Sequence, residues 1–240
     1  MPLENRRSWL LVSPLGSVAE ARSHGPDVLV VDLGKARSEE SGGKARAAVE
    51  EAAIDGAPVF ALVDSGRLNV DLEAVVWNGL CGVVLSRVES AEEVEACHVL
   101  LQRLEGERGI ESGSLEMVAS LDTALGNHRA MEIATGSIRI RALTLGRVDL
   151  EMSLGPEPSG EFHLLPYLMQ RLIIVARAAG VTPLGAWWRP PARGLVASPE
   201  DTYQAGVRGR ALGFKGSFCL RGDQVEPLNQ AYLSNGRSGA

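Results

Sequence analysis

The chain has 240 residues, 45% of them hydrophobic, and a formal net charge of −6, which is the composition of a globular protein with a sizeable core. The negative charge provides no basic field for nucleic acid or an anionic membrane, and the longest apolar runs are too short to span a bilayer, so we expect neither partner. Three cysteines without C-x-x-C spacing and four histidines without a cysteine–histidine cluster argue against a disulfide framework or a zinc site and predict free thiols in a reducing cytoplasm.

Short apolar runs alternate with helical or polar segments along the whole chain. The runs are nearly continuous in hydrophobic residues, as in parallel strands that are buried on both faces. We predict strands over the eight runs Trp9–Ser13, Val28–Leu33, Pro58–Val63, Gly82–Leu85, Leu115–Leu121, Ile138–Leu145, Pro183–Trp188 and Ser217–Leu220.

Helix signals are clearest in four of the segments between these runs. The predicted helices cover Ser38–Asp55, Ala91–Leu104, Phe162–Ala179 and Ser198–Leu212. Ser90 followed by Glu93 predicts a capping box at the start of the second helix. Gly180 and Gly213 stand where the last two helices are expected to end.

Eight β/α units in one pattern predict a TIM (β/α)8 barrel, with residues 1–240 as a single domain and 233–240 as a short polar tail. The alternative, a doubly wound open sheet, also alternates strands and helices. The sequence contains neither G-x-G-x-x-G nor a Walker A motif that would support a nucleotide site in such a sheet.

Charged residues follow the predicted strand ends, where a barrel of this kind carries its catalytic loops. They are Asp32, Asp64, Arg87, Glu89, Asp122, Arg147, Asp149, Arg189 and Arg221. Acids and arginines on one rim suit a metal–carboxylate cluster that binds an anionic ligand. The alternative is a set of solvated or paired loop charges.

Asp122 and Asp149 lie after neighbouring predicted strands within the segment Leu115–Leu150. Two acids at neighbouring strand ends are placed to share one hard divalent cation. Aspartate is also favoured in turns and at helix N-caps, so an ordinary structural role stays open for both residues.

Several segments resemble, in order, the HpcH/HpaI aldolase and citrate lyase β-subunit-like superfamily. They are Ala19–Lys44, Gly82–Ser90, Ser120–Gly126, Gly146–Leu150 and Ala211–Tyr232. The resemblance implies a TIM barrel that makes or breaks carbon–carbon bonds in acyl-CoA thioesters or 2-oxo acids. It also implies a homo-oligomer, trimer or hexamer, and a Mg²⁺ that stabilises an enolate together with an arginine.

The resemblance carries the metal site onto two residues of this chain. Asp149 matches the aspartate of the family's G-A-E-D-L motif, and Asp122 falls on the glutamate of E-T-A-R-G with an arm one methylene shorter. Leu62 occupies the position of the arginine in the family's V-R-x-N pattern. Gly34 and Lys35 replace the second and third acids of the D-L-E-D motif that begins at Asp32.

These correspondences define a predicted site and leave its activity open. The predicted residues are the metal ligands Asp122 and Asp149, the catalytic residues Arg147, Arg87 and Asp32, and the substrate-binding residues Glu89, Asp64 and Arg189. Arg147, two residues before Asp149, is the preferred replacement for the missing arginine. We expect a Mg²⁺-dependent lyase; the alternatives are a catalytically degenerate member that binds an acyl thioester and a structural subunit of an oligomer.

Overall fold

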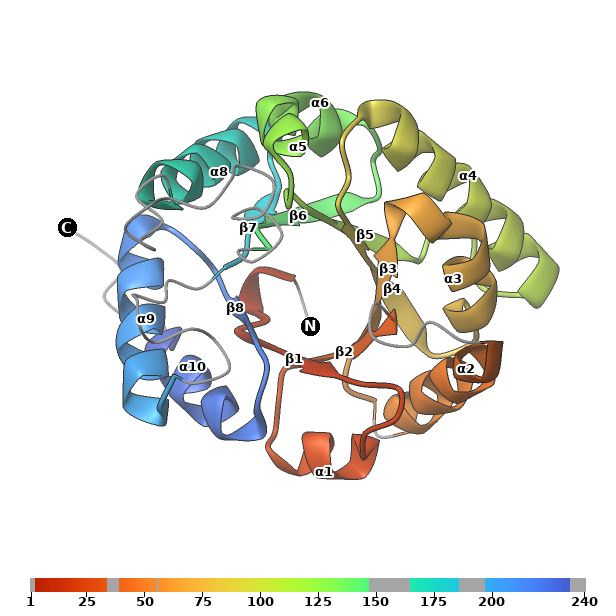
Figure 1. Cartoon of the computed structure of the whole chain (residues 1–240), viewed down its shortest axis with the longest axis horizontal. Helices are drawn as coiled ribbons and strands as arrows, with labels where there is room; N and C mark the ends of the chain where they lie inside the picture. The colour runs from red at the N-terminus through yellow and green to blue at the C-terminus, as the bar shows by residue number, and fades with distance from the viewer. Residues whose placement is uncertain (1–2, 34–38, 55, 147–164, 186–196, 234–240) are drawn as a thin grey trace.

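The computed structural model describes residues 3–33, 39–54, 56–146, 165–185 and 197–233, and its strands form a ring enclosed by helices (Figure 1). Eight parallel strands pair in the order β7-β6-β5-β4-β3-β2-β1-β8. A parallel bridge between Leu184 and Gly216 joins the two end strands, and the Gly185 amide donates to the Gly216 carbonyl at 2.9 Å. The predicted TIM barrel is therefore confirmed.

Each predicted apolar run overlaps a strand, with boundaries that differ by a few residues; the run Pro183–Trp188 shares only Pro183 with its strand. The strands are β1 Ser8–Val12, β2 Val28–Asp32, β3 Val59–Asp64, β4 Leu80–Ser86, β5 Glu116–Ser120, β6 Ile140–Thr144, β7 Thr182–Pro183 and β8 Ser217–Cys219. The last two are short, and the second half of the predicted run Pro183–Trp188 lies outside the described residues.

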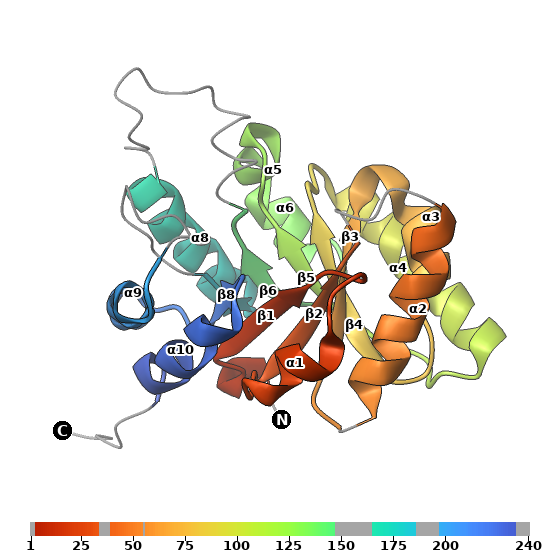
Figure 2. The same cartoon turned by 60° about the horizontal axis from the view of Figure 1, so that its bottom comes forward.

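Helices cover the outside of the barrel, with α2, α3 and α4 on one side and α8 and α9 on another (Figure 2). They are α1 Val18–Ser23, α2 Glu39–Ala53, α3 Leu68–Val75, α4 Ala91–Arg108, α5 Ala124–His128, α6 Ala130–Thr135, α8 Leu165–Ala179, α9 Pro199–Leu212 and α10 Val225–Ala231. Short 3-10 turns cover η1 Leu3–Asn5, η3 Ser65–Arg67 and η4 Gly222–Gln224. Among the described residues, none of these helices has the length and apolar character that a membrane span requires.

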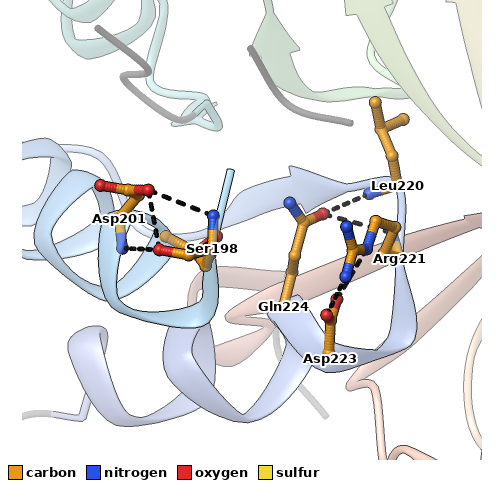
Figure 3. Close-up of polar contacts among 7 residues, drawn as sticks. Ser198, Asp201, Leu220, Arg221, Asp223 and Gln224 are labelled. Carbon is orange, nitrogen blue, oxygen red and sulfur yellow. Dashed lines mark hydrogen bonds and ion pairs between the residues drawn. The ribbon is translucent and has the colours of Figure 1, made fainter. Parts of the chain in front are cut away.

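The helix caps follow the local sequence closely, with one exception. Ser198 and Asp201 form a reciprocal capping box at the start of α9 (Figure 3), and Gly180 ends α8 with a φ of 72°. At α4 the Ser90 hydroxyl accepts from the Glu93 amide at 3.3 Å as predicted. The Glu93 carboxylate, however, accepts from the Glu89 amide at 2.8 Å, one residue earlier than a capping box requires, so half of that prediction is wrong.

Two apolar cores hold the barrel together. The larger one lies between the strands and the helices, and the smaller one fills the barrel interior with inward side chains that include Trp9, Phe60 and Val118. Trp9 packs edge-on against Phe60 with ring centroids 4.9 Å apart. At the amino-terminal end of the strands, Arg6 donates to Glu116 at 2.6 Å. In barrels of this kind the catalytic loops lie at the opposite, carboxyl-terminal end.

A buried ion pair ties the amino-terminal ends of β5 and β6 to the end of α4. Arg139 donates two hydrogen bonds of 2.7 Å to Glu105, which also accepts from the Gly113 and Leu115 amides. Burial alone would raise the pKa of Glu105, but the hydrogen bonds from Arg139 and from these amides outweigh it and hold the pKa below its ordinary value.

Replacing Arg139 should destabilise the fold strongly, because the Glu105 carboxylate would stay buried without its cation. We expect Arg139→Met to lower the free energy of unfolding by about 3–5 kcal/mol in urea titrations. The matched control is Arg103→Met, which removes an exposed pair with Glu73 on α3 and should cost less than about 1 kcal/mol. Equal losses in the two variants would contradict the assignment.

Candidate active site at the barrel mouth

Five of the predicted site residues belong to the described part of the chain, and all follow strand ends at the carboxyl-terminal mouth of the barrel. Asp32 ends β2, Asp64 ends β3, Arg87 and Glu89 follow β4, and Asp122 follows β5. The other three predicted residues, Arg147, Asp149 and Arg189, lie outside the described residues. Their roles remain predictions.

The Asp32 side chain lies on the inner face of the barrel. Val28 and Val30 belong to the interior core, and side chains two apart on a strand share a face. Asp32 is 7% exposed and pairs in register with Leu62 of β3. Leu62 packs against the same interior core, so the position at which the family has an arginine holds an apolar side chain.

Arg87 and Asp64 form an ion pair across the ends of β4 and β3. The guanidinium Nη2 donates to Asp64 Oδ2, and Asp64 Oδ1 accepts from the Gly66 amide at 2.9 Å. Burial alone would raise the pKa of Asp64, but the hydrogen bonds from Arg87 and Gly66 outweigh it and lower the pKa. Asp64 is therefore ionised at neutral pH, where its pair with Arg87 contributes to stability, and this contribution is lost as the pH falls through the lowered pKa.

The Asp122 carboxylate is 2% exposed and joins three strand ends. Its Oδ1 accepts from the Ser120 hydroxyl at 2.5 Å and from the Gly146 amide at 2.6 Å. Its Oδ2 accepts from the Arg87 amide at 2.9 Å. The N-cap of α5 is Thr123, whose hydroxyl accepts from Gly126, so Asp122 does not cap this helix.

The backbone around Asp122 is shaped to this carboxylate. Arg87 has a φ of 55°, a left-handed conformation that is uncommon for a residue with a side chain. Gly146 comes so close that a Cβ there would lie 2.4 Å from Asp122 Oδ1. The two features have the same effect. The Arg87 amide N–H points at Asp122 Oδ2, and the Gly146 amide N–H points at Asp122 Oδ1.

Two other charged residues in the described part of the mouth, Glu89 and Arg221, have local contacts. Glu89 is half-buried at the junction of β4 and α4, and its backbone amide donates to the Glu93 carboxylate. Arg221, after β8, pairs with Asp223, and the Gln224 side chain accepts from the Leu220 and Arg221 amides at 3.0 and 3.2 Å (Figure 3). These contacts shape the loop after β8.

Sequence reasoning missed the partners that fix the predicted acids. Ser120 and Gly146 bond Asp122, and Asp71 of α3 accepts from the Asp64 amide at 3.0 Å. Of these partners, only Ser120 could have been predicted from the sequence, because side chains two residues apart on a strand point to the same face.

Of the two predicted magnesium ligands, Asp122 belongs to the described residues and Asp149 lies outside them. Within the described ranges, no group of three or more His, Cys, Asp or Glu side chains could hold a metal ion. A carboxylate has about four acceptor positions, and those of Asp122 already take one hydroxyl and two amide donors.

An eight-stranded parallel barrel with acids and arginines at the carboxyl ends of its strands defines the class of TIM-barrel proteins whose sites occupy the mouth. Within that class the chain belongs to the HpcH/HpaI aldolase/citrate lyase family, which matches residues 9–221.

Similar proteins of known function include two kinds of lyase. Citrate lyase subunit beta of Escherichia coli is 30% identical over 163 residues, which are 68% of this chain and 52% of that protein, so the match spans about half its length. The Haemophilus influenzae subunit is 26% identical, covering 95% of this chain and 79% of its own. L-malyl-CoA/beta-methylmalyl-CoA lyase of Cereibacter sphaeroides is 24% identical, covering 86% and 71%.

Solved structures of low sequence identity share the fold. CitE from Mycobacterium tuberculosis in complex with magnesium and acetoacetate has a TM-score of 0.75 at 22% identity, covering 100% of this chain and 95% of that one. A magnesium/glyoxylate complex of Haloferax volcanii malate synthase has a TM-score of 0.78 at 19% identity, covering 99% and 78%. RipC from Yersinia pestis has a TM-score of 0.72 at 16% identity, covering 97% of both chains.

Because Gly146 lies so close to the Asp122 carboxylate, we expect the fold to require glycine at this position. We expect Gly146→Ala to lower the free energy of unfolding by about 1–3 kcal/mol, because the new methyl group would push the carboxylate away from its donors. Gly106→Ala on α4 is the matched control, since no atom lies near its added methyl group and alanine favours the helix by about 0.5–1 kcal/mol. Denaturant titration would contradict the requirement if both variants were stabilised.

Proposed function

We propose that the protein is a carbon–carbon bond lyase that acts at the barrel mouth on an acyl-CoA thioester or a 2-oxo acid through an enolate. The observation that carries the proposal is the inward, buried carboxylate of Asp32 at the end of β2, which pairs with β3, the strand that ends in the Arg87-bound Asp64. Membership of a family whose relatives include citrate lyase subunit beta and L-malyl-CoA/beta-methylmalyl-CoA lyase supports this reaction class.

The proposed reaction needs a base and a positive charge. Asp32 accepts the proton of a substrate hydroxyl, and the oxygen electron pair forms a new carbonyl as the adjacent carbon–carbon bond breaks. The electron pair of that bond passes into the enolate of the second product, whose α-carbon then takes a proton from Asp32. A cation at the mouth stabilises the enolate oxygen.

Other parts of the family chemistry are also proposed for this chain. Glu89, Asp64 and Arg189 are proposed to bind substrate, and Arg147 to face the enolate. Magnesium held by Asp122 and Asp149 would supply Lewis-acid stabilisation of the enolate oxygen. A homo-oligomer, trimer or hexamer, remains a prediction.

Non-catalytic binding of an acyl thioester is the second candidate function. The observation that favours it is Leu62, an apolar side chain at the position where family members have the arginine expected to stabilise the enolate. A protein of this kind would bind the thioester but would not exchange its α-protons. A structural role within an oligomer is a further form of the same alternative.

Proton exchange at the α-carbon separates the two functions. Incubated with acetyl-CoA or pyruvate in deuterated water, the parent protein should exchange α-protons, and Asp32→Asn should slow the exchange by about 10²–10⁴-fold while still binding the ligand. The control is Glu95→Gln, an exposed acid on the outer helix α4, which should exchange at the parent rate. Binding without exchange in the parent would favour the second candidate.

A further inference from the structure

We propose that the outer surface of the barrel over α2 and α4 binds the same surface of a second copy of this chain. The inference goes beyond the proposed lyase activity and does not depend on it, because this surface lies on the outer helices and not at the strand ends that form the mouth. It rests on a hollow, a fixed tryptophan and two exposed stripes of side chains.

The surface is hollowed where the shortest of three neighbouring helices ends. The helix α3 has 8 residues and packs between α2, with 15, and α4, with 18 (Figure 2). Beyond its end lies a cavity of about 730 Å³, whose lining residues are Arg46, Glu50, Trp77, Asn78, Glu107 and Arg108. The hollow is therefore built from α2, α4 and the turn that follows α3.

Trp77 is held rigidly in this hollow. The guanidinium carbons of Arg46 and Arg108 lie 3.7 and 4.0 Å from its ring centroid, on opposite faces of the ring, because two such groups would overlap on one face. The indole N–H donates to the Ala74 carbonyl at 3.2 Å, and Arg108 donates to the Val76 carbonyl at 2.5 Å. The half-buried ring is thus already ordered, and a partner that packs on it would lose little side-chain freedom there.

Two stripes of side chains flank the hollow, one on each long helix. On α2, Arg46 and Glu50 are followed one turn later by Ile54, which is 78% exposed. On α4, Val99, 53% exposed, is followed at the same spacing by Arg103 and Glu107. We call these two stripes, together with Trp77, the α2–α4 patch. It combines a tryptophan and arginines with apolar side chains inside a rim of paired charges, which is the composition of a protein–protein contact.

The charges of the α2–α4 patch favour a second copy as the occupant. Each stripe holds one arginine and one glutamate, and the two are paired within the stripe, Arg46 with Glu50 at 2.9 Å and Arg103 with Glu107 at 3.8 Å. The whole chain has a net charge of −6, so two copies repel each other over most of their surface, and they approach most easily where the charges balance. A polyanionic partner such as nucleic acid would require a positive patch instead.

The shape of the patch is also self-complementary. Ile54 lies one helical turn beyond Glu50, a lining residue of the hollow, and its amide donates to the Glu51 carbonyl at 3.3 Å, so the turn is continued through this residue. When two copies pair about a two-fold axis, every contact occurs twice, once from each copy. The projecting Ile54 of each copy then packs into the Trp77 hollow of the other, which removes both apolar surfaces from water.

Sedimentation velocity of the full chain tests the inference. We expect reversible pairing between about 1 and 100 µM, and we expect Ile54→Asp to raise the dissociation constant about tenfold or more, because a charge would be buried against Trp77. Val99→Asp, on the other stripe, should weaken pairing in the same direction. Both side chains are exposed, so neither change affects the core, and melting curves verify that the variants are folded.

The matched control is Ile174→Asp, which changes another exposed isoleucine, 68% exposed, on α8 across the ring from α2 (Figure 1). This variant should pair as the parent does. A parent chain that stays monomeric over the whole concentration range overturns the inference and leaves the hollow to a different occupant. Pairing that survives both Ile54→Asp and Val99→Asp, or that is lost only in Ile174→Asp, overturns it as well.

The outcomes are separable from those of the lyase proposal. A chain that exchanges α-protons and remains monomeric supports the lyase and overturns this inference. A chain that pairs through the α2–α4 patch without exchange upholds this inference and defeats the lyase.

Discussion

The hydrogen bonds of the Asp122 carboxylate determine how the mouth of this barrel is arranged. Parallel strands are joined along their lengths by regular backbone hydrogen bonds, but beyond the strand ends those bonds stop and the polar backbone needs other partners. Asp122 supplies them for the loops after β4 and β6, through Arg87 and Gly146, while Ser120 of β5 fixes its own orientation. The direction of Arg87 follows from this arrangement.

Below the mouth, the barrel is filled by apolar side chains, and this limits where chemistry can occur. The interior core runs from η1, at the amino-terminal end of the strands, to Leu62, two residues before the end of β3. A charge inside this core would lose its hydration unless it were paired, as Arg6 is with Glu116. The polar groups available to a substrate therefore belong to the last strand residue or to the loops, as Asp32, Asp64 and Arg87 do.

A metal ion and a guanidinium are two possible sources of positive charge at such a mouth. Solved structures of the same fold include complexes described with magnesium, and in this chain the Asp122 carboxylate accepts two backbone amides. A metal ion and a guanidinium both stabilise an anionic oxygen, but they need different surroundings. The metal needs carboxylate oxygens open to the mouth, and the guanidinium needs a fixed backbone and one acid to orient it.

The sequence by itself determined the approximate positions of the strands, four of the helices and the barrel class, because burial on both faces leaves continuous apolar runs and helix caps depend on residues a few positions apart. It also placed Asp32, Asp64, Arg87, Glu89 and Asp122 at strand ends. Only the tertiary structure decided which groups surround Asp122, since its partners Arg87 and Gly146 lie 35 and 24 residues away in the chain. An acid that follows a strand has the same sequence signal in any surroundings, and the difference lies in which backbone amides the fold brings to it.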